Sequence, residues 1–278
     1  MDAKTTISVI MACYNCEKTL AKAIDSILDQ TYTDWVMICC DDGSTDHTLD
    51  ILKQYEAEYP DQIQVIQNER NRKLPYSLNH CLEFVQTDLV ARMDADDWSL
   101  PERFERQVLF LKEHPDADLV GTGVRVTNGE KIIAAIIQPY KPVPKDMLYY
   151  NCFSHATIMT YKRVYDALGG YSLLPYVERC EDFDLWSRFF EAGFTGYNIR
   201  DELYVVYDDD NAIRRRTWQN RVNAARTASA AFKRLNQHGF ACFKKSYLQI
   251  LKFFVPMGLY KKLHQWTMNR RSRNSTRR

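Results

Sequence analysis

The segment MDADDW, residues 93–98, carries three carboxylates directly after an apolar run. Aspartates spaced as Asp-x-Asp on a turn offer the oxygen ligands that suit Mg²⁺ or Mn²⁺, and both ions keep coordination sites for phosphate. Carboxylates alone repel a diphosphate, but a divalent cation held between them removes that conflict and stabilises a diphosphate leaving group. Asp94, Asp96 and Asp97 therefore form a candidate metal and diphosphate site, with a solvated acidic turn as the alternative.

Strands and helices are expected to alternate over the first hundred residues. Apolar runs predict strands at 7–12, 35–40, 63–66 and 89–93, and helical spacing predicts helices at about 17–30 and 75–84. Such alternation is typical of an α/β fold with a mainly parallel sheet and helices on both faces, in which ligands bind at the carboxyl ends of the strands. Asp41 and Asp42 follow the second strand as Asp94 follows the fourth, so two acidic clusters converge on the expected ligand edge.

The charge of the chain is unevenly distributed. Net charge is +1, yet no acidic residue follows Asp210, and 17 Lys and Arg residues lie between Arg214 and Arg278. Such asymmetry suggests an electrostatic partner for the basic part. Short strands are expected at 120–126 and 132–137, and the chain beyond residue 214 reads as helical. We expect an α/β domain over residues 1–210 and a basic helical extension over 211–278.

The sequence also predicts a location. Its start lacks the pattern of a signal peptide, and no run of about 18 apolar residues predicts a membrane-spanning helix. A cytoplasmic, reducing location is expected, where the eight cysteines are free thiols. Cys13 and Cys16 form a C-x-x-C pair that invites a redox or zinc interpretation, but no second pair at metal-ligand spacing accompanies it.

Several motifs occur in a recognisable order between residues 7 and 207. They are SVIMACYNCE (8–17), CCDDGSTD (39–46), MDADD (93–97), HATIM (155–159), GGY (169–171) and EDFDLW (181–186). Together they resemble the family 2 glycosyltransferases, which are inverting enzymes with the Rossmann-like GT-A nucleotide-sugar-binding fold. The first motif departs from the family pattern in having Ala12 where Pro is usual.

The resemblance implies a nucleotide pocket and roles for the residues that line it. Ala12, Tyr14 and Glu17 are expected to line the pocket, with Tyr14 stacked against a uracil. Asp42 is expected to accept a hydrogen bond from N3–H of that base.

The resemblance also implies how the phosphates are held. Asp94 is expected to face the ribose, and Asp96 is expected to ligate the Mn²⁺ or Mg²⁺ that bridges the diphosphate. Arg72 is expected to help bind the phosphates, although Asn71-Arg72-Lys73 departs from the usual Gly-containing segment.

Asp182 matches the general base of the family. An acceptor hydroxyl is a weak nucleophile until its proton is removed, and the chemistry therefore requires such a base. Helix capping is the alternative interpretation of Glu181 and Asp182, because carboxylates favour the first turn of a helix. The two interpretations are compatible.

His155 and the aspartates at 208–210 are two further candidate sites. His155 is interpreted as a hydrogen-bonded structural residue. Asp208, Asp209 and Asp210 lie where many relatives carry a metal-binding His, and one of them is an alternative third metal ligand.

The basic extension holds a candidate membrane segment. Residues 247–260, YLQILKFFVPMGLY, are apolar and aromatic and are flanked by Lys244-Lys245 and Lys261-Lys262. Such composition suits a helix lying in a membrane interface, where each basic residue contributes about 1 kcal/mol. A helix packed on the core is the alternative. No nucleic-acid motif is present, so no nucleic acid is expected as a partner.

The sequence therefore predicts a metal-dependent, inverting hexosyltransferase that moves one sugar from a UDP-sugar to an acceptor hydroxyl. A single transfer is expected because RRRTW (214–218) replaces the Q-x-x-R-W of processive members. The expected acceptor is a saccharide on a polyprenyl diphosphate in surface polysaccharide (O-antigen or capsule) biosynthesis, reached from the cytoplasmic face of the inner membrane. The alternatives are a nucleotidyltransferase acting on sugar phosphates and a non-catalytic nucleotide-sugar or membrane-binding module.

Overall fold

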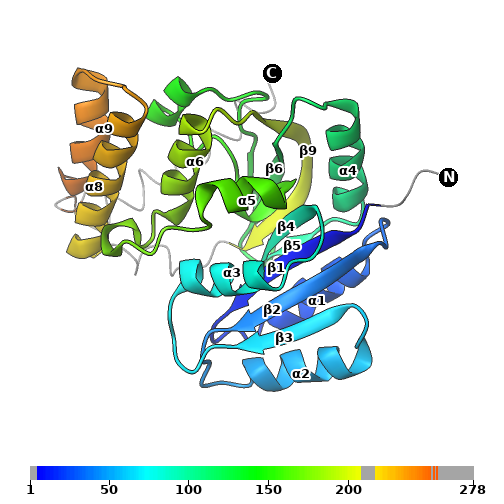
Figure 1. Ribbon diagram of the computed structural model, residues 1–278. Coiled ribbons are helices and arrows are strands. Elements are labelled where there is room, and N and C mark those ends of the chain that lie inside the picture. Colours follow the sequence, from blue (N-terminus) through cyan, green and yellow to red (C-terminus); the bar gives the residue numbers. More distant parts are fainter. Residues whose placement is uncertain (1–4, 208–216, 252, 254, 256–278) are drawn as a thin grey trace.

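The computed structural model describes residues 5–207 and 217–251, together with Phe253 and Val255. In this part of the chain, one sheet crosses the molecule and helices lie against both of its faces (Figure 1). Its strands are β1 (Ile7–Cys13), β2 (Trp35–Asp41), β3 (Ile63–Gln67), β4 (Leu89–Asp94), β5 (Trp98–Ser99), β6 (Leu119–Thr127), β7 (Ile132–Ile136), β8 (Met159–Tyr161) and β9 (Gly196–Tyr207). The α-helices are α1 (Leu20–Leu28), α2 (Thr48–Glu58), α3 (Leu74–Glu83), α4 (Arg103–Glu113), α5 (Lys162–Leu168), α6 (Glu181–Glu191), α8 (Trp218–Arg234) and α9 (Phe240–Leu251). Short 3₁₀ helices are η1 (Pro144–Leu148), η2 (His155–Thr157) and η3 (Pro175–Val177).

The strand order creates a reversal at the centre of the sheet. The order is β3-β2-β1-β4-β8-β6-β9-β5, with β7 paired to β6. Strands β1 to β4 are parallel, and β1 lies between β2 and β4. β8 runs antiparallel to β4 and β6, whereas β6 and β9 are parallel. Most paired residues lie in parallel pairs, which confirms the expected mainly parallel sheet.

Strands β1, β2 and β4 are buried on both faces, which is why they read as apolar runs, whereas β3 at the end of the sheet buries alternate residues. Along β1, Val9 and Met11 join one hydrophobic cluster and Ile10 joins the other, since alternate side chains point to opposite faces. The first cluster includes buried side chains of α1, α2 and α4, such as Leu20. The second includes those of α3, α5, α6 and α8, such as Trp186. The prediction of helices on both faces is therefore confirmed.

The predicted elements differ from the observed ones mainly at their ends. Each of the first four strands extends one residue further at its carboxyl end than predicted. Helix α1 begins at Leu20 and not at about residue 17, because the preceding turn bonds to the loop after β2. The N–H of Cys16 donates to Thr48 Oγ1 at 2.8 Å, and the N–H of Glu17 donates to Asp46 Oδ2 at 3.2 Å.

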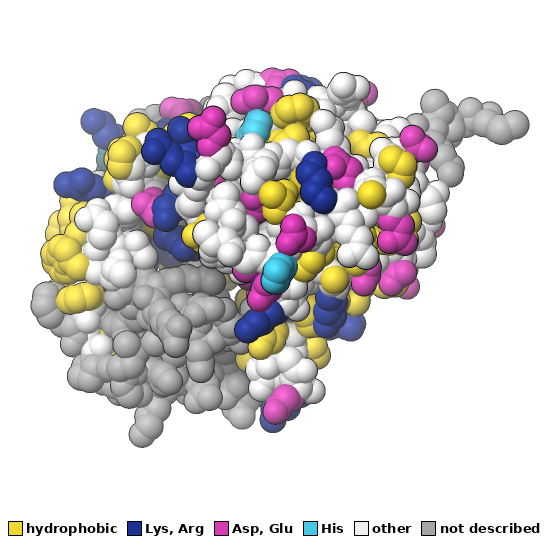
Figure 2. Space-filling model, turned by 90° about the horizontal axis from the view of Figure 1, so that it is seen from below, with side chains coloured by type: hydrophobic (Ala, Val, Ile, Leu, Met, Phe, Trp, Pro, Cys, Tyr) yellow, Lys and Arg dark blue, Asp and Glu magenta, His cyan; other side chains and the backbone are white. Residues whose placement is uncertain are grey.

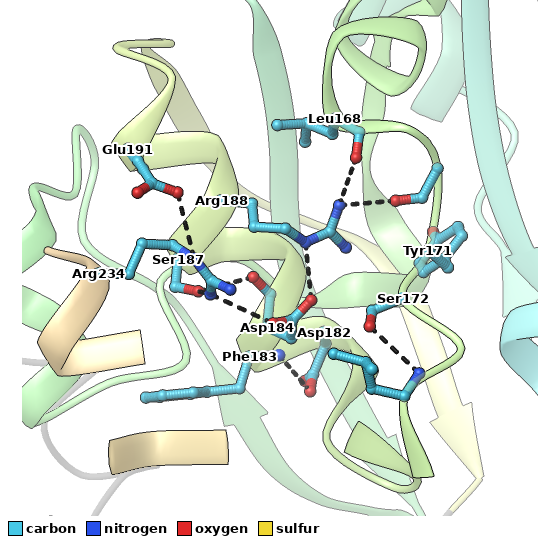
Figure 3. A network of polar contacts seen from close by, with 12 residues as sticks. Leu168, Tyr171, Ser172, Asp182, Phe183, Asp184, Ser187, Arg188, Glu191 and Arg234 are labelled. Atoms are coloured by element: carbon cyan, nitrogen blue, oxygen red, sulfur yellow. Dashed lines mark hydrogen bonds and ion pairs between the residues drawn. The ribbon is translucent and has the colours of Figure 1, made fainter. Parts of the chain in front are cut away.

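A buried ionic network ties α8 to α6 (Figure 3). Asp184 is almost fully buried; Arg188 Nε donates to its Oδ2 at 2.7 Å, and Arg234 Nη1 lies 3.2 Å from its Oδ1. Arg234 comes from the last turn of α8 and also pairs with Glu191 at 3.1 Å. The predicted boundary between residues 210 and 211 lies outside the described residues, but α8 itself packs on the α/β body.

Replacing Asp184 by Asn is expected to lower the free energy of unfolding by about 3 kcal/mol, because it leaves two partly buried guanidinium groups without the buried carboxylate that they share. Asp166→Asn is the matched control: Asp166 pairs with Lys162 on the exposed face of α5, and its loss is expected to cost less than about 0.5 kcal/mol. Urea unfolding measures both. Equal effects of the two substitutions would contradict the assigned role of the network.

Candidate active site

A cavity of about 730 Å³ opens at the carboxyl ends of β1, β2 and β4, and we call it the donor cavity. This is the edge at which the strand order reverses, as expected for ligand sites in such sheets. It brings together most of the residues that the sequence analysis selected, namely Ala12, Tyr14, Glu17, Asp42, Asp94 and Asp96.

One end of the donor cavity has the features of a base-binding site. Tyr14 is 47% exposed and offers a ring surface. Asp42 is buried, and it accepts hydrogen bonds from Asn68 Nδ2 at 2.8 Å and from the backbone N–H groups of Arg72 and Lys73 at 2.7 and 2.8 Å. Its Oδ2 accepts only the bond from Lys73 among these, so this oxygen keeps a lone pair for a ligand.

Arg72 is not among the lining residues of the donor cavity. Its guanidinium lies 4.2 Å from the centre of the Tyr76 ring, and its backbone N–H serves Asp42. Lys73 lines the cavity instead, at a turn where its φ is 75°. Lys18 and Arg179 also line the cavity, and sequence reasoning had singled out neither of them.

The acidic turn after β4 provides a set of oxygen ligands for a divalent cation. Carboxylate oxygens of Asp94, Asp96 and Asp97 all lie within 4.8 Å of one another. Burial, together with the charges of Asp94 and Asp96, raises the pKa of Asp97 well above its usual range. Asp96 is exposed and lines the cavity. Crowded carboxylate oxygens of this kind fit Mg²⁺ or Mn²⁺, which take oxygen ligands.

Arg92 supplies a buried positive charge beside this turn. Its Nη2 lies 2.5 Å from Asp94 Oδ1, and its Nη1 donates to Asp94 Oδ2 at 3.1 Å. Burial opposes the charged guanidinium most strongly, but Asp94 together with the Tyr171 and Tyr204 hydroxyls outweighs this effect, and the pKa of Arg92 is raised. Its Nε is buried and has no hydrogen-bond partner in the described part of the chain. Sequence reasoning missed Arg92, although a charged residue inside an apolar strand was a visible signal.

A second cavity, of about 580 Å³, adjoins the donor cavity and contains Asp182. The two cavities share wall residues, namely Leu74, Arg92, Asp94, Arg179 and Glu181. Asp182 lies in the first turn of α6, where its Oδ1 accepts from the N–H of Phe183 at 2.7 Å and its Oδ2 accepts from Asn151 Nδ2 at 2.6 Å. Asp182 therefore lies at the start of a helix and also lines a cavity, so the two interpretations of this residue are compatible.

His155 lines the second cavity as a neutral, hydrogen-bonded side chain. Its Nε2 lies 2.8 Å from the Tyr171 hydroxyl, and its ring meets Trp186 edge-on. Burial and the charge of Arg92 hold the pKa of His155 well below its usual range. These contacts agree with the structural interpretation. Asp208, Asp209 and Asp210 lie outside the described residues.

The cysteines are all free, as expected. Cys13 and Cys16 line the donor cavity, and their mutual hydrogen bond raises the pKa of Cys13 and lowers that of Cys16.

Comparison with known proteins identifies relatives in sequence. Residues 8–169 match the model of Glycosyl transferase family 2. A Bacillus subtilis (strain 168) protein named as the glycosyltransferase EpsE is 46% identical over 235 residues, which make up 84% of each chain. WfgD of Escherichia coli, a UDP-Glc:alpha-D-GlcNAc-diphosphoundecaprenol beta-1,3-glucosyltransferase, is 27% identical over 180 residues, or 65% of this chain and 68% of WfgD.

Solved structures share the fold. S. aureus TarS 1-349 in complex with UDP-GlcNAc gives a TM-score of 0.70 at 16% identity, covering 94% of this chain and 78% of that one. The mannosyltransferase PcManGT from Pyrobaculum calidifontis, in complex with GDP-Man and Mn²⁺, gives 0.64 at 15% identity, covering 96% and 80%. These likenesses confirm the expected GT-A fold class.

Glu181 lies in the wall between the two cavities, and its ionisation lowers the stability of the folded protein. Burial and the neighbouring Asp182 raise its pKa to about 7. Its Oε2 has no hydrogen-bond partner among the described residues. The folded protein therefore binds this proton more tightly than the unfolded chain does, so stability falls as pH rises toward 7.

Glu181→Gln is expected to raise the free energy of unfolding by about 2 kcal/mol more at pH 8 than at pH 5, because only the ionised carboxylate carries the burial cost. Chemical unfolding at the two pH values measures this difference. Glu178→Gln, at an exposed neighbouring position, controls for the loss of one carboxylate. A gain of the same size at both pH values would refute the raised pKa.

Proposed function

The chain belongs to glycosyl transferase family 2, and from this membership we propose that it transfers one hexosyl unit from a UDP-sugar to an acceptor hydroxyl with inversion at the anomeric carbon. One observation carries the proposal. The cavity that holds the acidic turn and the cavity that holds Asp182 share a wall that includes Arg92, Asp94 and Glu181. A sugar at this wall would have its leaving diphosphate on one side and a base on the other.

The donor cavity suits a nucleoside diphosphate sugar. Tyr14 offers a ring for stacking, and Asp42 Oδ2 keeps an acceptor position for N3–H of a uracil. The TarS complex with UDP-GlcNAc supports UDP as the nucleotide. The donor cavity thus takes the UDP part, and the donor sugar points to the shared wall.

Asp96 would hold Mn²⁺ or Mg²⁺ together with its neighbouring carboxylates. When bound, the cation neutralises the diphosphate and stabilises UDP as the leaving group. The PcManGT complex with GDP-Man and Mn²⁺ supports a metal at such a site. Asp94, already paired with Arg92, keeps its orientation toward the donor cavity.

Asp182 is the general base of the proposed reaction. The acceptor hydroxyl gives its proton to the Asp182 carboxylate while its oxygen forms a bond to the anomeric carbon. The bond from that carbon to the phosphate oxygen breaks, and UDP leaves with the electron pair. Attack from the side opposite the leaving group inverts the configuration. Asn151 and the Phe183 N–H hold the carboxylate in place.

The acceptor is proposed to be a saccharide on a polyprenyl diphosphate, as the name of WfgD states for that relative. Surface polysaccharide assembly at the cytoplasmic face of a membrane is the corresponding role. On α9, Cys242 and Ser246 face inward, whereas Phe240, Phe243 and Tyr247 are exposed. Hydrophobic side chains gather at this end of the molecule beside Lys and Arg (Figure 2). This composition favours a peripheral, interfacial contact, and no described helix is long and apolar enough to span a bilayer.

Two rival functions fit less well. A nucleotidyltransferase would release pyrophosphate, whereas a glycosyltransferase releases UDP, and family membership favours the second. A non-catalytic binding module would lose no activity when Asp182 is changed.

UDP is expected to bind the wild-type protein in the presence of Mn²⁺, and Asp96→Ala is expected to weaken this metal-dependent binding by at least about tenfold, the equivalent of 1.4 kcal/mol. Calorimetric titration with and without Mn²⁺ measures the effect. Glu105→Ala, on α4 away from the donor cavity, is the control. A UDP affinity that changes neither with Mn²⁺ nor with Asp96→Ala would rule out the proposed diphosphate site.

Asp182→Asn is expected to lower the rate of sugar transfer by about 10²–10⁴-fold while leaving UDP binding intact, because the amide cannot take the acceptor proton. Release of UDP from a panel of UDP-sugars measures the rate. Asp166→Asn on α5 should behave as wild type. Transfer at the wild-type rate in Asp182→Asn would remove this residue from the mechanism.

A further inference from the structure

A third cavity, of about 140 Å³, lies between the first turn of α6, helix α8 and Lys245 of α9. Asp182 lines it as well as the second cavity, so this carboxylate is reached from two sides. The acidic residues of the donor cavity, Asp94 and Asp96, do not line it. The third cavity thus shares Arg179 with the donor cavity but not its acidic turn, and the proposed base lines it.

Two cationic side chains line the third cavity. Lys245 comes from α9, and Arg179 comes from the turn before α6. Arg179 is exposed and lines all three cavities, and its φ of 66° is a strained value for a residue with a side chain. Such strain clusters at ligand sites. The N–H groups at the start of α6 add partial positive charge at the same place.

Apart from the carboxylate of Asp182, the rest of the wall is uncharged, and Asn151, Cys180 and Thr227 contribute to it. Phe183 lies on α6, and Ala224 and Ala228 lie along α8. The described parts of α8 and α9 contain no acidic residue, since none follows Asp210 in the sequence. The outward side of α9 carries the exposed apolar side chains Phe243, Tyr247 and Leu248 beside the exposed Lys244. An apolar chain that leaves the cavity along α9 therefore has exposed apolar side chains to contact.

We propose that the third cavity binds the phosphate group of a lipid-linked acceptor, with Arg179 and Lys245 as its cations. The assignment rests on the proposed function, because the acceptor hydroxyl must reach Asp182. A phosphate held here leaves the sugar that it carries against Asp182. The apolar chain then runs past the small residues of α8 toward the exposed apolar side of α9.

The test is a calorimetric titration of the full-length protein with hexyl diphosphate, in the presence of saturating UDP and Mn²⁺ to fill the donor cavity. Lys245→Ala is expected to weaken binding at least about tenfold, since it removes a charge-assisted contact. Lys245→Met keeps the apolar stem of the side chain and should show the same loss in a folded protein. Lys244→Ala, whose exposed side chain lies on the same helix outside the cavity, should bind as wild type.

UDP binding measured on the same samples distinguishes failure of the phosphate subsite from failure of the proposed function. Wild type that binds UDP but not hexyl diphosphate would overturn the phosphate subsite alone, whereas wild type without UDP binding would overturn the proposed function and the subsite with it. Equal losses in Lys244→Ala and Lys245→Ala would also overturn the subsite. Inorganic pyrophosphate and phosphatidylglycerol vesicles form the remaining arms, and Lys245-dependent binding of either as tight as that of hexyl diphosphate would overturn the assignment to a lipid diphosphate.

Discussion

The buried guanidinium of Arg92 is the charge on which the site depends. Five carboxylates converge near the end of β4 and the start of α6, and their mutual repulsion must be offset before an anionic substrate arrives. Arg92 pairs with Asp94 through two contacts, and its charge opposes the rise in the pKa of Asp97 and of Glu181. The same charge helps to keep His155 neutral. The charge of one residue thus acts on titratable groups on both sides of the shared wall.

The sheet topology explains why both cavities meet at this residue. β4 lies between β1, which begins the nucleotide-binding half, and β8, which leads into the second half. Its carboxyl end therefore faces the loops after β1 and β2 on one side and the segments around η2 and α6 on the other. A strand at the edge of the sheet could not serve both. The reversal of strand order thus brings the acidic turn and the proposed base Asp182 to opposite sides of one wall.

The sequence predicts the donor half better than the acceptor half, for physical reasons. Strands buried on both faces must be apolar, so β1, β2 and β4, and the aspartates at the ends of β2 and β4, were visible in the sequence. Arg92 and Asp94 also carried a signal, because residues two apart on a strand share a face. Arg72 and Lys73 did not, since the φ of 75° at Lys73 belongs to a turn that residue types alone do not determine. Arg234 and Asp184 are far apart in the sequence, and no hydrophobic periodicity predicts that they pair.

Helix α6 connects the basic extension with the cavities that Asp182 lines. Asp182 in its first turn lines the acceptor-side cavities, and Asp184, two residues later, anchors α8 through Arg234. This anchor and the buried Ala231 and Phe232 hold the wall that α8 contributes next to Asp182. The donor cavity is therefore built at the ends of parallel strands, and the third cavity in part by the extension. If the proposed subsite is correct, changes on α8 and α9 alter acceptor binding while the donor cavity keeps its own supports, so the two specificities vary separately.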